Sequence, residues 1–493
     1  MTSAWDSMMP LNSGSNYSGF IYDQIYDKLI QANNEGEYIP RLADSWEVNA
    51  ESTEVTFHLN PNATWHDGQP LTADDVLFTF QMYSDPAVTA IGRYYLSAIA
   101  GTDESGAEVS EDSIGVTKVD DKTVTIAMKS VMYPGNLYNN LVSVYIVPKH
   151  IFGEKTVDEI NAPDLWMNNP VGSGPFKFES KIDGERMEFT ANETYFQGAP
   201  KIDRLVVRIV PTANLLAGLM SGEIDILAGG GLGSILLDDW GTAQAQENLV
   251  TSSSPTKNYQ ILIINNSKPY FNQAVRQAIS MSINREALVN ALLQGQGQAI
   301  VTPISPISPY YNPEVTVDYD PEQAKTILAQ ENFPFDQEMV FFVPSGNTTR
   351  ERAAALIQQD LLAVGIKAEI QSVDFPTLMS NMGNNMHDFG IIGSGGSNDP
   401  SESRQMLAVE SEYNFSKTTS TAYADKADEG NAALTFETRK PIFDEYQVLI
   451  KEEVPMAYLY TTNSLMAYNK RMVVENLDDF GVLSWSTWTW DVK

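Results

Sequence analysis

The sequence contains no cysteine among its 493 residues. Such a chain forms no disulfide and offers neither a thiol nucleophile nor thiolate ligands for a metal. Basic residues are also few, with 31 Lys and Arg against 64 Asp and Glu, which gives a formal net charge of −33. Because a surface of that sign repels phosphate backbones and anionic lipid, we expect no nucleic-acid partner and no polybasic contact with a membrane.

Long apolar runs are absent too. No run reaches the roughly 18 apolar residues that a transmembrane helix needs, and the first residues do not have the pattern of a signal peptide. Two interpretations are compatible with this: a cytosolic protein, or the mature form of an exported protein whose signal and acylated lipobox cysteine have been removed.

Residues for catalysis or metal binding form no recognisable constellation. The adjacent acidic pairs Asp74-Asp75 and Asp238-Asp239 do not face one another on a helix, and no G-x-S-x-G elbow occurs. We expect no metal, no cofactor and no enzymatic activity. A hydrolase, the alternative class, would need a nucleophile or converging carboxylates that the sequence does not offer. The histidines are scattered without paired-ligand spacing: His58, His66, His150 and His387.

Apolar residues make up 43% of the chain, and its length suggests about three domains of roughly 150 residues each. Between residues 40 and 150 the sequence is rich in strand patterns, with clean alternation at Glu54–Leu59. Residues 2–5 also have the composition of a short strand.

After residue 258 the pattern changes to alternating strands and helices. Tyr259–Asn265 is a nearly continuous apolar strand. Glu351–Val364 is an amphipathic helix that stops at Gly365, and Lys367–Val373 alternates as a strand. Strand, helix and strand in this order predict an α/β unit.

One segment, residues 64–86 with the sequence TWHDGQPLTADDVLFTFQMYSDP, has a clear local structure. Asp67-Gly68 is a tight-turn dipeptide. Thr72 lies three residues before Asp75, the spacing of a capping box, and the apolar residues that follow share one helical face. The segment therefore predicts a structural role and no catalytic one.

Residues 64–86 resemble the signature of family 5 extracellular solute-binding proteins, the receptors for peptides, nickel and oligosaccharides that feed ABC importers. Further segments resemble the same family in the same order: FNQAVRQAISMSINREALV at 271–289, YDPEQAKTIL at 319–328, AALIQQDLLAVGIKAEI at 354–370 and VPMAYLYTTN at 454–463.

The resemblance implies an α/β fold with two lobes, like a periplasmic binding protein of type II in its large cluster C form, with an added β-rich subdomain and a hinge between the lobes. The two segments in which the chain crosses between the lobes, and which form this hinge, would lie near Asn258 and Thr462. The implied regions are lobe I at 1–40, 165–257 and 464–493, the added subdomain at 41–164, and lobe II at 258–463.

The resemblance also implies a function. The chain would be an extracytoplasmic substrate-binding protein, either a cell-surface lipoprotein or periplasmic, and a monomer anchored to the membrane only through lipid. It would capture oligopeptides by closure of a cleft and deliver them to permease subunits of an ABC importer. An oligosaccharide or another neutral ligand is the alternative cargo.

Ligand contacts in this family come from loops at strand ends that face the cleft, and several such loops here are rich in glycine, which allows close backbone approach. The residues that the resemblance places at the ligand are Trp5, Asn16, Tyr17, Gly230, Gly231, Asn258, Tyr259, Asn347, Gly395, Gly396, Ser397, Asn398, Asp399 and Trp485.

Two charges that hold peptides in relatives are missing from their usual places. Peptide-binding relatives carry an aspartate for the α-ammonium at a position that here is Gly396 or Ser397, so either Asp399 substitutes for it or this anchor is absent. Dipeptide-binding relatives carry an arginine for the α-carboxylate within the stretch that here is residues 343–347, which has no basic residue. Arg350 and Arg352 follow, and we expect both to face solvent.

Aromatic residues leave the ligand class open. Flat rings in a cleft suit sugars, and Trp5 and Tyr17 are the favoured candidates. Trp485, Trp488 and Trp490 lie close together in the sequence, and terminal strands that bury them in lobe I are the alternative to a role at the ligand.

Overall fold

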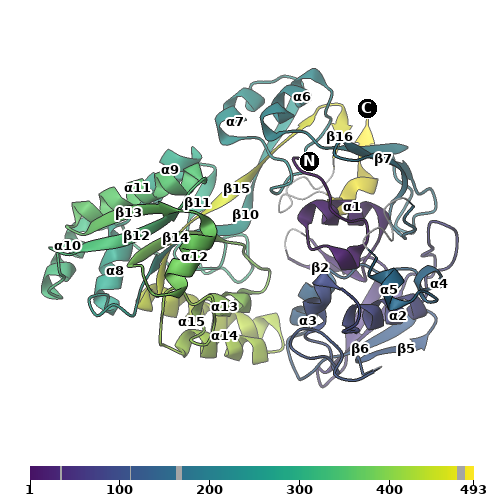
Figure 1. The fold of residues 1–493 in the computed structure, drawn as a ribbon, viewed down its shortest axis with the longest axis horizontal. Coiled ribbons are helices and arrows are strands. Elements are labelled where there is room, and N and C mark those ends of the chain that lie inside the picture. Colours follow the sequence, from purple (N-terminus) through teal and green to yellow (C-terminus); the bar gives the residue numbers. More distant parts are fainter. Residues whose placement is uncertain (34–35, 112, 163–168, 475–483) are drawn as a thin grey trace. The chain divides into compact units, whose positions relative to one another are not determined.

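The computed structural model describes residues 1–33, 36–111, 113–162, 169–474 and 484–493. They form two compact units: unit 1 comprises Met1–Ser254 and Ser464–Lys493, and unit 2 comprises Pro255–Asn463 (Figure 1). The chain leaves unit 1 along β10 (Leu249–Ile264) and returns along β15 (Met456–Asn469). The predicted crossings near Asn258 and Thr462 fall within these two strands.

Unit 1 contains a four-stranded antiparallel sheet in the order β3-β4-β6-β5 and a three-stranded antiparallel sheet in the order β7-β8-β9. Its strands are β1 (Ile30–Ala32), β2 (Tyr38–Pro40), β3 (Ala43–Val48), β4 (Glu54–Leu59), β5 (Val116–Asp120), β6 (Thr123–Ala127), β7 (Phe176–Ile182), β8 (Arg186–Ala191), β9 (Arg204–Arg208), β16 (Met472–Val473) and β17 (Asp491–Val492). Its α-helices are α1 (Asn16–Ile25), α2 (Ala73–Ser84), α3 (Pro134–Leu141), α4 (Lys149–Phe152), α5 (Val157–Ile160), α6 (Leu215–Ser221) and α7 (Leu237–Gln244), with short 3-10 turns at η1 (Pro10–Asn12), η2 (Ile91–Leu96), η3 (Thr212–Asn214) and η5 (Ser484–Thr489).

The signature segment forms the turn and helix that its sequence predicts. Gly68 adopts a φ of 87°, which glycine tolerates in a tight turn. At the start of α2, the Thr72 backbone N–H donates to Asp75 at 2.8 Å, and the capping box is complete. The helix packs on the core of β3–β6, which also contains Met9 and Leu29 from the N-terminal part of the chain. The separation of residues 41–164 as a subdomain stays a prediction.

Unit 2 is built on one six-stranded sheet in the order β11-β15-β10-β14-β12-β13, where β12 is parallel to both β13 and β14. The remaining strands are β11 (Gly297–Ala299), β12 (Glu338–Pro344), β13 (Lys367–Val373) and β14 (Phe389–Ser394). The helices are α8 (Gln273–Ser282), α9 (Arg285–Leu293), α10 (Pro321–Gln330), α11 (Thr348–Ala363), α12 (Phe375–Gly383), η4 (Pro400–Ser403), α13 (Arg404–Leu407), α14 (Ala422–Ala432) and α15 (Phe436–Glu453).

Helices cover both faces of this sheet. Leu262 and Ile264 of β10 belong to one apolar cluster with α8, α9 and α11, whereas Ile261 and Ile263 belong to another with α15. Because alternate side chains point to opposite faces, a strand buried on both faces needs apolar residues throughout. This explains the nearly continuous apolar run that the sequence shows.

Two local predictions differ from the structure. Residues 2–5 form no strand; Thr2 instead donates its backbone N–H to Leu232 at 2.7 Å as an irregular segment. The amphipathic helix predicted from Glu351 begins earlier, at Thr348, because the Asn347 side chain accepts the backbone N–H of Arg350 and caps it. Its predicted stop at Gly365, which has a φ of 91°, is confirmed.

Candidate ligand-binding site

The carboxyl ends of β12, β13 and β14 lie at one edge of the unit 2 sheet because these strands are parallel. Ligands of open α/β sheets bind at this edge. Tyr259 pairs with Ser394 and Gln260 with Gly393, so the first unit 2 residues of β10 lie at the same edge. The edge is therefore the part of unit 2 where loops can gather around a ligand.

Five of the expected site residues line one small cavity at this edge. Its volume is about 90 Å³. The expected residues that line it are Tyr259, Gly395, Gly396, Ser397 and Asp399. Asn258 is exposed beside Gly395, Asn398 is half-buried in the same loop, and Asn347 is exposed at the start of α11. The structure thus brings together the loops that the sequence places far apart.

The carboxylate of Asp399 is buried and already has a cationic partner. Arg439, on α15, donates to both carboxylate oxygens at 2.9 Å, and the two side chains are only 6% and 0% exposed. Asp399 also accepts the backbone N–H of Ser401 at 2.9 Å and so caps the turn after the loop. These contacts favour a structural role for Asp399 and the absence of an ammonium anchor.

One of the two positions expected for the missing aspartate, Gly396, is closed off by main chain. A Cβ atom added to Gly396 would collide with the carbonyl oxygen of Lys257. Lys257 is half-buried, and burial lowers the pKa of its amine to about 8, against the opposing field of Glu402. An acidic side chain at Gly396 therefore has no room in this backbone.

Arg350 does not face solvent as the sequence analysis predicted. Arg352 is exposed, as predicted, but Arg350 is half-buried and its Nε donates to Oε1 of Gln260 at 2.7 Å. Burial lowers the pKa of its guanidinium below the ordinary value, and burial raises the pKa of the neighbouring Tyr460 to about 12 although the charge of Arg350 opposes that rise. Its place was not evident from the sequence because it depends on the β10–β14 register.

In unit 1 the structure joins two of the predicted loops. The Tyr17 hydroxyl donates to the carbonyl of Gly231 at 3.3 Å. Gly230 and Gly231 have φ values of 47° and 81°, so glycine is needed to form this turn. Asn16 is exposed at the first position of α1.

The tryptophans of unit 1 serve mostly in packing. Trp5 is 7% exposed and belongs to an apolar cluster with Phe20, and Trp490 is 2% exposed. Trp488 covers the Arg41 guanidinium, 4.6 Å from its ring centroid. Trp485 is half-buried, and its carbonyl accepts Nη1 of Arg41 at 2.9 Å. A role of Trp5 or Trp485 at the ligand stays a prediction.

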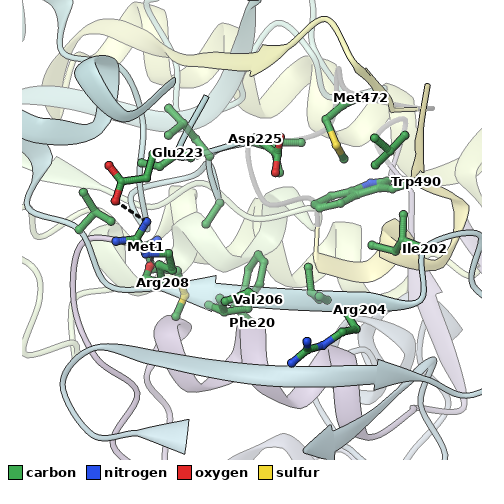
Figure 2. A pocket seen from close by; sticks show the side chains of 18 of the residues that line it. Met1, Phe20, Ile202, Arg204, Val206, Arg208, Glu223, Asp225, Met472 and Trp490 are labelled. Carbon is green, nitrogen blue, oxygen red and sulfur yellow. Dashed lines mark hydrogen bonds and ion pairs between the residues drawn. The ribbon is translucent and has the colours of Figure 1, made fainter. Parts of the chain in front are cut away.

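Unit 1 also holds a larger pocket, of about 500 Å³, that none of the expected site residues line. Figure 2 shows the Trp490 ring, Met472 and Ile202 on one side and the Arg208–Glu223 pair on the other. The two charged groups of that pair lie 2.7 Å apart. The pocket combines an apolar wall with the ion pair of Arg208 and Glu223.

Within the described residues, no group of three or more His, Asp or Glu side chains could hold a metal ion. No helix in the part of the chain that the structure describes has both the length and the apolar character needed to cross a bilayer.

The fold matches that of a solved structure along the whole chain. The chain superposes on the ABC transporter substrate-binding protein CtaP from Listeria monocytogenes with a TM-score of 0.86 at 21% identity, covering 100% of this chain and 98% of that one. At this identity the likeness shows the fold alone: the mixed α/β architecture of type II periplasmic binding proteins.

The family follows from the sequence comparison. Residues 37–415 match the model of the bacterial extracellular solute-binding proteins, family 5 (middle part). Oligopeptide-binding protein AppA of Bacillus subtilis (strain 168) is 28% identical over 95% of this chain and 86% of its own length. Heme-binding protein A of Haemophilus influenzae is 26% identical over 88% of this chain and 80% of its own. The chain belongs to the family 5 solute-binding proteins of ABC transporters, which are binding proteins and not enzymes.

Proposed function

We propose that this chain captures oligopeptides outside the cytoplasmic membrane and delivers them to the permease of an ABC importer. The observation that carries the proposal is the loop Gly395–Asn398 beside Tyr259, which offers main chain and small polar side chains while the charge of Asp399 is neutralised by Arg439. An extended peptide presents amides and carbonyls at regular spacing, which such a loop can bind without a dedicated ammonium anchor. The name of the Bacillus subtilis relative, oligopeptide-binding protein, supports the same cargo.

Closure of unit 1 and unit 2 on the peptide is the proposed mechanism. A ligand shifts such an equilibrium only by its differential affinity for the closed form. Micromolar affinity corresponds to about 8 kcal/mol, so the contacts made in the closed form must supply that amount in addition to the cost of closure. Small-angle X-ray scattering with and without peptide tests this step: we expect a smaller radius of gyration with peptide, and an unchanged radius at saturation contradicts closure.

An oligosaccharide is the competing cargo, because no charged anchor stands where peptide-binding relatives have one. Sugar binding would draw on exposed aromatic rings, yet Trp5 and Trp490 are buried and Trp488 covers Arg41. We therefore favour peptide and keep the glycan as an outcome of the test.

The experiment is native mass spectrometry of the purified protein, followed by extraction and fragmentation of any bound molecule. Short peptides in the extract support the proposal, and a hexose-spaced mass contradicts it. A thermal-shift screen of peptides of two to nine residues against glycans follows if the protein is empty. Stabilisation by glycans and not by peptides would overturn the peptide assignment.

Anchoring by lipid at the cell surface, or free residence in the periplasm, and a monomeric state complete the proposal. The membrane fraction of cells that express the full-length gene tests the first point. Extraction of the protein from that fraction by detergent and not by salt supports a lipid anchor.

A further inference from the structure

One edge of the three-stranded sheet in unit 1 has no neighbouring strand among the described residues. In the order β7-β8-β9, β9 pairs with β8 along one edge only. Directly after β9, the N–H of Ile209 donates to Glu185 at 2.8 Å, on the side of β8. Because bonded and non-bonded positions alternate along an antiparallel pair, Arg204, Val206 and Arg208 direct their backbone groups to the open edge.

Met1 lies at one end of this open edge as a strand residue would. Its α-amine donates to the carbonyl of Arg208 at 2.8 Å, and its carbonyl accepts the N–H of Val210 at 2.7 Å. A residue that bonds in this way to both neighbours of the residue opposite it, here Ile209, has the hydrogen-bond pattern of a parallel pair. A chain that ran into Met1 from its N-terminal side would therefore lie along β9 from the Arg204 end.

The nitrogen of Met1 occupies a place that suits a neutral peptide N–H. Met1 is only 8% exposed, and burial lowers the pKa of its α-amine to about 6. A peptide nitrogen at the same place would make the same bond to Arg208 without a charge to desolvate. These surroundings favour continuous main chain over a charged amine.

The 500 Å³ pocket of unit 1 lies directly along the open edge, and we call it the edge slot. Figure 2 shows Arg208 and Arg204 along the strand, with Met1 beside Arg208. Residues 223–228 line the slot opposite β9. They are paired with β15 on their other side, where Asp225 accepts the N–H of Asn469 at 2.7 Å. In the described part of the chain, no backbone hydrogen bond joins β9 to residues 223–228.

The side chains of the edge slot offer apolar cover and one unused donor. Phe20, Met472 and Trp490 line it. Trp490 is 2% exposed, and its Nε1 has no hydrogen-bond partner among the described residues. Arg208 is already paired with Glu223 at 2.7 Å. An occupant with a free main chain and apolar side chains at alternate positions fits this lining.

We propose that the edge slot holds one more β-strand, parallel to β9, made by the residues of this protein that precede Met1. The five residues directly before Met1 would lie opposite the five residues of β9. The second residue before Met1 would donate to Val206 and accept from Arg208, and the fourth would donate to Arg204 and accept from Val206. A strand added to an exposed edge gains main-chain bonds along its whole length. The inference is independent of the proposed cargo, and it identifies the Arg204 end of β9 as the place where the chain enters unit 1.

The test compares three versions of the protein by hydrogen–deuterium exchange and mass spectrometry. The first is the present chain. The second carries five further residues, threonine and valine in alternation, directly before Met1. The third is the matched control, with proline at the second and fourth positions before Met1, because proline has no N–H to donate to β9. A free acetylated peptide with the same threonine and valine sequence is added to the first version in large excess as a separate sample.

We expect the added strand to slow amide exchange in fragments that span 204–208 by about tenfold or more, since the N–H groups of Val206 and Arg208 gain acceptors. The melting temperature of unit 1 should rise in scanning calorimetry. The proline version should exchange in these fragments like the present chain. Fragments of β13, which belongs to unit 2, should exchange equally in all three versions.

Protection by the added strand and not by the proline version confirms the inference. Equal protection by both versions, or by neither, overturns it, because main-chain pairing with β9 is then not the cause. Protection by the free peptide with none from the added strand also overturns it, and makes the edge slot a binding site for a separate chain. Far-UV circular dichroism establishes that each version is folded. None of these results bears on the proposed cargo.

Discussion

Replacing Asp399 by asparagine separates two roles that one carboxylate can have in this receptor. If Asp399 holds the peptide ammonium, Asp399→Asn abolishes binding and barely changes stability. If it serves the ion pair with Arg439, Asp399→Asn lowers the stability of the protein and barely changes peptide binding. Because Arg439 donates to both oxygens and neither side chain is more than 6% exposed, we predict the structural outcome.

The magnitude follows from burial. Removing one partner of a buried ion pair costs about 3–5 kcal/mol, because the other charge is left without compensation. In a domain of roughly 150–250 residues, each kcal/mol lowers the melting temperature by about 2–4 °C, which gives a fall of roughly 6–20 °C for unit 2. Asp399→Asn should lie at the low end, since the amide oxygen can still accept the N–H of Ser401. Arg439→Gln should lie at the high end.

Differential scanning calorimetry is the assay, because two units can melt in separate transitions. The double variant Asp399→Asn/Arg439→Gln should lose less than the sum of the single variants, since it leaves no lone buried charge. Peptide affinity measured well below the transition should change by less than about threefold, equivalent to roughly 0.6 kcal/mol. A wild-type melting temperature together with lost peptide binding in Asp399→Asn would refute this reasoning.

Three further predictions concern other parts of the chain. Gly396→Asp should not create an ammonium anchor and should lower the melting temperature, because its Cβ would collide with the Lys257 carbonyl; tighter binding of free-amine peptides than of N-acetylated ones in this variant would contradict that. Thr72→Ala should destabilise unit 1 by about 1 kcal/mol through loss of the α2 cap, with Thr72→Ser as the control, as measured by urea unfolding. Burial lowers the pKa of His66 and of His387 to about 4, so both are neutral in the folded protein while the unfolded chain takes up protons below about pH 6.5. Stability should therefore fall as the pH drops from about 6.5 towards 4, and His387→Gln should weaken that pH dependence in urea titrations; an unchanged slope would exclude His387 as a contributor.

Local signals account for the parts of the fold that the sequence predicts well. Strict alternation located β4 at Glu54–Leu59 and β13 at Lys367–Val373 with the same bounds as in the structure. The capping box at Thr72 and the helix stop at Gly365 depend on residues within a few positions of one another. Such features need no knowledge of the rest of the chain.

The contacts of the charged residues at the candidate site could not be predicted without the tertiary structure. Arg439 lies 40 residues beyond Asp399, and no spacing rule connects them. Arg350 was expected to face solvent, yet its contact with Gln260 depends on the pairing of Gln260 with Gly393 across two strands. The candidate loops could be named from the family resemblance; which charges in them remain available for a ligand could not.

The distribution of charge at the unit 2 edge is what distinguishes this proposed receptor from one that holds peptides by their ammonium group. The negative charge of Asp399 is cancelled by Arg439, and the backbone of Lys257 lies against Gly396, one of the two positions expected for a relative's aspartate. Arg350, by contrast, is half-buried and has no carboxylate partner among the described residues. The proposed peptide would therefore be held at this edge mainly through its main chain, since Asp399 is not available to its ammonium group.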